Sequence, residues 1–208
     1  MTDAIVTRSD DQVVPAPPIA TGADTTFEIV PRKGLIAVAV VFVGLIVAIA
    51  ANQRWPLELA HVGGGAAWTI IDLFMGFVIG PILGTMSIAG RIELTKRLMP
   101  KMVLIMPTVV TLTLAGGWQL GAYLGTVNSG FPGHGWVVAS YIVVGIMAVI
   151  ALGLLEPANI AVLFELRKPQ PNPAVIEKLM KRFIYTAAIT GAMQIAILII
   201  MTRISGYL

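Results

Sequence analysis

Two ionisable side chains within one long apolar stretch are the residues of this sequence best suited to chemistry. His61 and Asp72 both fall inside residues 57–84. Ionisable groups are costly in hydrocarbon, so those found there usually face a protein interior, a cavity or a bound group. Because each helical residue turns by about 100°, a spacing of eleven residues brings both to one face, about 16 Å apart along the axis. We interpret them as two separate sites on that face.

A histidine in this position can ligate haem or a metal ion. A membrane haem needs one or two axial ligands and an apolar slot, and histidine is the usual ligand. The run Gly63–Gly65 beside His61 would let a flat macrocycle approach the helix, and Trp68 and Trp118 complete this candidate cofactor cluster. His134 is a candidate second ligand for haem b or a metal. The alternatives are a histidine that is merely hydrogen-bonded to a neighbouring helix, and a copper or proton site.

Asp72 lies near the expected middle of the membrane. One interpretation is structural: a neutral carboxylic acid hydrogen-bonded to Thr108, Thr111 or Gln194. The other is functional: a proton relay or a substrate-facing acid, with Gln194 as its polar neighbour. The sequence leaves both open.

A basic cluster follows the second apolar stretch. It consists of Arg91, Lys96, Arg97 and Lys101, with Glu93 among them. Control of membrane topology explains such charges. The alternative is an anion-binding rim built on Arg91 and Arg97, for porphyrin propionates or lipid phosphates.

Five apolar stretches must position these side chains. They cover residues 34–51, 57–84, 102–125, 136–155 and 183–202. Each is near or above the roughly 18 residues that span a bilayer as a helix. The composition agrees, since 12% of residues are charged against about 25% in a soluble domain. We predict an all-α, polytopic membrane helix bundle of five transmembrane helices over residues 34–208.

The distribution of basic residues predicts the orientation. Of the 14 Lys and Arg residues, all but Arg54 and Arg203 lie before the first span or in the second and fourth loops. The positive-inside rule then puts the N-terminus in the cytoplasm and the C-terminus outside. We therefore expect a multi-pass protein of a bacterial inner membrane. The formal charge of +3 requires no nucleic-acid partner.

Residues 1–33 are predicted to be a disordered cytoplasmic tail, because they contain several prolines and no apolar periodicity. Arg32 and Lys33, followed by an apolar run, resemble a signal sequence with a cleavage site at residues 48–50. The long preceding tail favours an uncleaved anchor.

Prolines and glycines predict bends and close contacts. A kink is expected at Pro81, and a turn or break at Glu156-Pro157. Glycines recur at four-residue spacing at positions 76, 80 and 84, and again at 117, 121 and 125, a pattern that lets helix backbones approach closely in lipid. No internal sequence repeat is evident. The chain has no cysteine and its ten methionines are scattered, so we interpret the methionines as packing residues.

Residues 57–125 resemble a loose group of bacterial membrane families that includes the HemJ-type protoporphyrinogen oxidases and the CopD-type copper-resistance proteins. The residues that carry the resemblance are His61, Trp68, Lys96-Arg97-Leu98-Met99-Pro100, Thr111-Leu112 and Gly117-Trp118. In the HemJ-type proteins the histidine is associated with haem b, so the resemblance implies haem b at His61. The chain departs from the pattern in having this helix second and in carrying Asp72 alone among the polar positions that follow the tryptophan.

Three classes of function remain open. The first is a redox enzyme or electron carrier that binds haem b or a metal through His61. The second is a copper or small-solute permease with a polar path past Asp72 and Gln194. The third is a non-catalytic accessory subunit of a larger membrane complex, or a homo-oligomer, whose other partner is the lipid bilayer.

Overall fold

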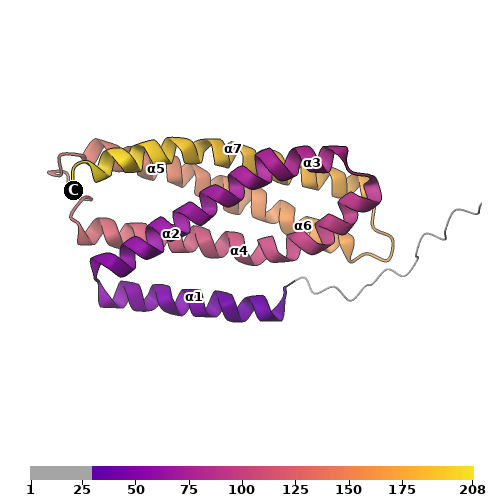
Figure 1. The fold of residues 1–208 in the computed structure, drawn as a ribbon, viewed down its shortest axis with the longest axis horizontal. Helices are drawn as coiled ribbons and strands as arrows, with labels where there is room; N and C mark the ends of the chain where they lie inside the picture. Colours follow the sequence, from indigo (N-terminus) through magenta and orange to yellow (C-terminus); the bar gives the residue numbers. More distant parts are fainter. Residues whose placement is uncertain (1–29) are drawn as a thin grey trace, which may run out of the picture.

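The computed structural model describes residues 30–208, and this part of the chain is helical without strands (Figure 1). Five of its helical segments are long and apolar enough to cross a membrane, so the predicted all-helical architecture with five helices able to span a membrane is confirmed. The elements in chain order are α1 (Arg32–Ala51), α2 (Arg54–Leu73), the π-helical turn η1 (Phe74–Ile79), α3 (Gly80–Thr85), α4 (Ile88–Tyr123), α5 (His134–Ile150), the π-helical turn η2 (Ala151–Leu155), α6 (Glu156–Leu166) and α7 (Pro173–Ser205). Most of the predicted tail lies outside the described residues.

The helices form one bundle in which α2 crosses both α4 and α7. The pair α5 and α6 runs along α7, and α6 also contacts α4. Helix α1 lies at the edge of the bundle beside α4 (Figure 1), and only 11% of its most apolar window is buried. Its apolar side chains are therefore mostly exposed, as expected of a helix that borders lipid.

The bundle has a basic end and an opposite end. The start of α1, the turn at residues 86–87 and the loop at residues 167–172 form the basic end. The opposite end carries the turn at residues 52–53, the loop at residues 124–133 and the C-terminus, marked in Figure 1. At that end Asn52 adopts a left-handed φ of 45°, which asparagine tolerates better than most residues. Its side-chain carbonyl accepts a hydrogen bond of 2.9 Å from Gln119 Nε2, which ties the α1–α2 turn to α4.

Both π-helical turns precede a proline. The amide of Gly80 bonds the carbonyl of Met75, and that of Glu156 bonds the carbonyl of Ala151, so each pairs five residues back. Pro81 and Pro157 follow immediately, and a proline lacks the N–H and clashes with the carbonyl four residues earlier. One widened turn accommodates the ring without ending the helix.

This arrangement corrects one prediction and shows two helices that extend beyond their predicted spans. The expected break at Glu156-Pro157 is wrong, because η2 lets the helix continue as α6 to Leu166. Helix α4 begins at Ile88, well before the predicted start of its span at 102, so the cluster expected in a loop lies on its first turns. Helix α7 similarly begins at Pro173 rather than at 183. Hydropathy detects only the part of a helix that crosses hydrocarbon, and a helix can continue past it.

The core of the bundle is rich in methionine. Six methionines are buried within it, at positions 75, 99, 102, 106, 147 and 180. Flexible thioether side chains fill irregular gaps between helices, so this burial supports the packing interpretation.

Candidate functional site

The most enclosed polar site lies where α2 meets α7 near the middle of the bundle. Asp72 is 1% exposed there, and Gly191 of α7 packs against its backbone. A Cβ at Gly191 would come within 3.3 Å of the Asp72 carbonyl carbon. The absence of a side chain at this position lets the two helices approach closely and brings α7 polar groups to Asp72.

Several polar atoms in this site have no hydrogen bond. The side chains of Thr190, Trp68 and Gln194 face the Asp72 carboxyl group. Among the described residues, however, no hydrogen bond of good geometry reaches either Asp72 oxygen, Trp68 Nε1 or Gln194 Nε2. A buried polar group without a partner costs about 1–3 kcal/mol. The site therefore holds donors and an acid that are available to a proton, a water molecule or a small solute.

Of the partners expected for Asp72, the structure places only Gln194 beside it. Gln194 lies beside it, and its Oε1 accepts a 3.1 Å hydrogen bond from Thr69 Oγ1. Thr108 instead donates to the carbonyl of Leu104 in its own helix, and Thr111 is exposed. Thr190, fully buried on α7, was not anticipated, because a lone threonine in an apolar helix carries no signal that distinguishes it from a structural one.

A second buried polar group follows η2. Asn159 is 0% exposed, and within residues 30–208 neither its amide nitrogen nor its amide oxygen has a hydrogen-bond partner. The adjacent Glu156 faces Asn159 and also has a buried oxygen, Oε2, without a partner in that range. The predicted helix break placed both residues at the membrane surface, so the sequence did not indicate the burial of Asn159 or of the Glu156 oxygen.

His61 is held by α4. Its Nδ1 donates a 2.9 Å hydrogen bond to the carbonyl of Thr113, and its ring packs against Gly117, where a Cβ would lie 2.4 Å from Nδ1. Gly64 in the neighbouring glycine run is equally close to α4, since a Cβ there would approach Thr113 Oγ1 to 2.8 Å. The glycines on both helices therefore serve helix contact at this point.

The other predicted cofactor residues are dispersed. Trp68 belongs to the Asp72 site, whereas Trp118 is 63% exposed and its ring lies 5.7 Å from that of Tyr141. His134 begins α5, with Nδ1 buried and lacking a partner in the described part of the chain. Residues 30–208 contain no group of three or more His, Asp or Glu side chains arranged to hold a metal ion.

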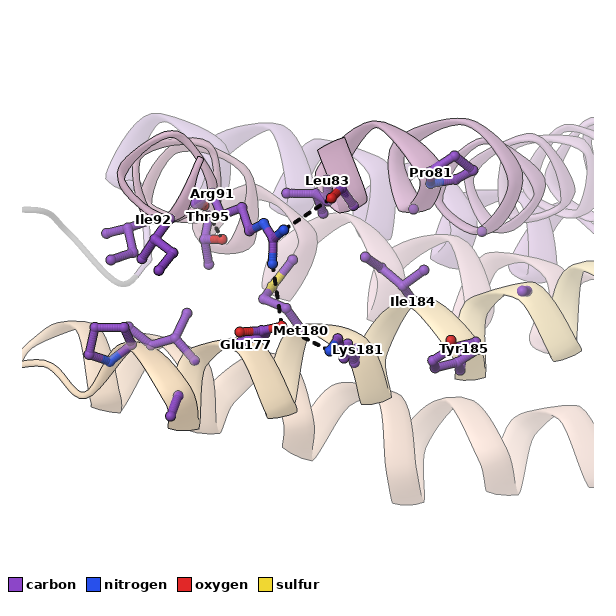
Figure 2. Close-up of a pocket in the computed structure, with 18 of the residues that line it drawn as sticks. Pro81, Leu83, Arg91, Ile92, Thr95, Glu177, Met180, Lys181, Ile184 and Tyr185 are labelled. Carbon is purple, nitrogen blue, oxygen red and sulfur yellow. Dashed lines mark hydrogen bonds and ion pairs between the residues drawn. The ribbon is translucent and has the colours of Figure 1, made fainter. Parts of the chain in front are cut away.

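The bundle also contains a large pocket at its basic end, between α3, the start of α4 and the start of α7 (Figure 2). Its volume is about 700 Å³. Arg91 lines it and forms an ion pair of 3.3 Å with Glu177, which also pairs with Lys181 at 2.8 Å. Arg97, the second residue of the predicted rim, lies on the surface and pairs with Glu93 instead.

Comparison with known proteins gives no match to a family model, to a curated protein or to a solved structure. The resemblance to the HemJ-type and CopD-type proteins therefore stays a prediction.

Proposed function

We propose that this chain is a proton-translocating permease in which Asp72 takes up and releases the proton. One observation carries the proposal: a carboxyl group 1% exposed, inside a membrane-spanning helix, without a hydrogen-bond partner among residues 30–208. Intramembrane acids of this kind mark proton relays and substrate pathways.

The surroundings of Asp72 support the same function. The π-helical turn η1 begins two residues after it, and π-helical turns recur at functional sites. Trp68 and Gln194 turn N–H donors toward the carboxyl group, and neither donor has another partner among the described residues. The proposal includes a bacterial inner membrane with the N-terminus in the cytoplasm, and the concentration of Lys and Arg at the basic end supports that orientation.

The test is proton flux into liposomes that contain the purified full chain and a pH-sensitive dye, driven by a potassium diffusion potential. We expect flux above that of protein-free liposomes, and its loss in Asp72→Asn, which keeps the shape of the protonated acid. Glu58→Gln is the matched control, since it removes an exposed carboxylate from the same helix. Flux that persists in Asp72→Asn, or is absent from the wild type, would overturn the proposal.

Haem b binding at His61 is a second candidate function, supported by one contact. Histidines that ligate metals usually donate their other ring N–H to a carbonyl or carboxylate, and Nδ1 of His61 donates to Thr113. Nε2 then carries the lone pair that a ligand needs. A Soret band in the purified protein, lost in His61→Ala and kept in His134→Ala, would support this candidate; its absence from the wild type would contradict it.

A further inference from the structure

The pocket at the basic end is apolar along most of its length. Gly76 and Gly80 with Ile184 and Ala188 line its part toward the middle of the bundle, and its charged residues lie at the other end, here called its mouth. A Cβ on Gly84 would meet no described atom within 4 Å, so this glycine leaves space beside α3. A hydrocarbon chain fits such a wall better than a hydrated solute does.

The pocket opens sideways, toward the position of the lipids. One residue that lines it, Tyr185, is 69% exposed. It lies in the apolar part of α7, a helix long and apolar enough to cross a membrane, and exposed apolar side chains on such helices face hydrocarbon. A ligand from the surrounding leaflet can therefore enter without crossing water.

The mouth of the pocket is positively charged. The charged residues that line the pocket are two basic ones, Arg91 and Lys181, and one acidic one, Glu177, so their net charge is +1 (Figure 2). The first turns of α4 and α7 also line it, and helix N-termini carry partial positive charge. Arg91 is held in place by 3.0 and 3.1 Å hydrogen bonds to the carbonyls of Met86 and Gly84, so its charge stays at the mouth.

We propose that this pocket binds one anionic phospholipid of the adjoining leaflet. One acyl chain lies along the wall of Gly80 and Ile184, and the phosphate lies at the mouth beside Lys181, because Glu177 Oε1 occupies the position between Arg91 and Lys181. Guanidinium and ammonium groups at the membrane surface attract lipid phosphates in this way. The site is independent of the proton pathway proposed for Asp72.

Native mass spectrometry of the purified full chain tests the charge requirement, with phosphatidylglycerol and phosphatidylcholine of identical acyl chains as probes. We expect preferential retention of one phosphatidylglycerol. Lys181→Gln should weaken its binding about fivefold, whereas Lys178→Gln, the same change on an exposed residue of the same helix outside the pocket, should not. Glu177→Gln should strengthen it. Equal binding of the two lipids, or equal effects of the two lysine variants, would overturn the proposal.

A second pair of variants tests the proposed position of the acyl chain in the pocket. Gly84→Leu fills the pocket, whereas Gly44→Leu adds the same side chain on α1, where a Cβ also meets no described atom within 4 Å. We expect loss of phosphatidylglycerol binding in the first variant only. Unchanged binding in Gly84→Leu would overturn the proposed acyl position, and displacement of the lipid by excess inorganic phosphate would indicate a free-anion site instead.

Discussion

Asp72 and Asn159 are single residues whose burial costs stability. Each lies at 1% exposure or less, and the described residues provide neither side chain with a hydrogen bond of good geometry. Each also adjoins a π-helical turn, Asp72 just before η1 and Asn159 just after η2. Polar groups retained under these conditions are candidates for function, because an apolar residue would stabilise the bundle more.

The missing partners of Asn159 lead to a stability prediction. Asn159→Ala should lower the free energy of unfolding by less than about 1 kcal/mol, since the amide makes no hydrogen bond of good geometry to another described residue. Leu163→Ala, also 0% exposed and one turn along the same helix, should cost about 2–5 kcal/mol. Unfolding in mixed micelles measures both values. Equal costs would show that Asn159 makes a stabilising interaction.

The contact between His61 and Gly117 is a second residue-scale feature with a measurable consequence. A methyl group at Gly117 would displace the imidazole and break its hydrogen bond to Thr113, so Gly117→Ala should destabilise the protein by about 1 kcal/mol. In a His61→Ala background the methyl group has room, and the cost should largely disappear. A double-mutant cycle measures this coupling; a cycle with no coupling would contradict the contact.

At the scale of elements, η1 and α7 determine where the pocket ends. Gly76 of η1 touches Ala188 of α7, since a Cβ at Gly76 would come within 2.6 Å of the Ala188 Cα. Asp72 lies one turn beyond this contact on α2, and Thr190 lies just beyond it on α7. The contact therefore separates the basic-end pocket from the Asp72 site.

Gly76→Ala should consequently be the most disruptive glycine substitution on this segment. The methyl group meets backbone atoms of α7 and forces η1 away, at a cost of about 1–3 kcal/mol. Gly84→Ala, which meets no described atom, is the matched control and should cost little. Thermal unfolding of the two variants in one detergent compares them, and equal midpoints would rule out the close contact.

At the scale of the whole molecule, the same succession of helical elements occurs twice along the chain. A helix interrupted by a π-helical turn and a proline is followed by a long continuous helix, first as α2–η1–α3 with α4 and then as α5–η2–α6 with α7. Both interrupted helices run from the opposite end to the basic end, and both carry an acid next to the π-helical turn, Asp72 buried and Glu156 partly buried. The sequence showed no such repeat, because the shared feature is the position of one proline and one polar residue rather than a motif.

The orientation of the whole molecule is open to direct measurement. The chain has no cysteine, so single cysteines can be added at exposed loop positions without background. In intact cells, a membrane-impermeant maleimide should label Asn128→Cys in the α4–α5 loop, and should label Gln170→Cys in the α6–α7 loop only after lysis. The reverse pattern would invert the proposed topology.

Hydropathy along the chain was enough to predict five apolar helices and their approximate positions. Hydropathy is a local property, because every residue of a spanning helix must suit hydrocarbon whatever its neighbours are. The same reasoning singled out Asp72, Gln194 and Arg91, since polar groups stand out against an apolar background. It also supported the packing role of the methionines, which the buried core bears out.

Which polar groups meet, and how far the helices extend, depends on how the helices pack against one another. Thr190 reaches Asp72 because Gly191 lets α7 approach α2, and that contact joins positions more than a hundred residues apart. The helix continues from α5 through Pro157 because η2 is a widened turn. A proline in the sequence predicts a helix break and gives no sign of such a turn. Lys181 and Arg91 share one pocket for a similar reason, since only the crossing of α3 and α7 brings two separate basic clusters to one mouth.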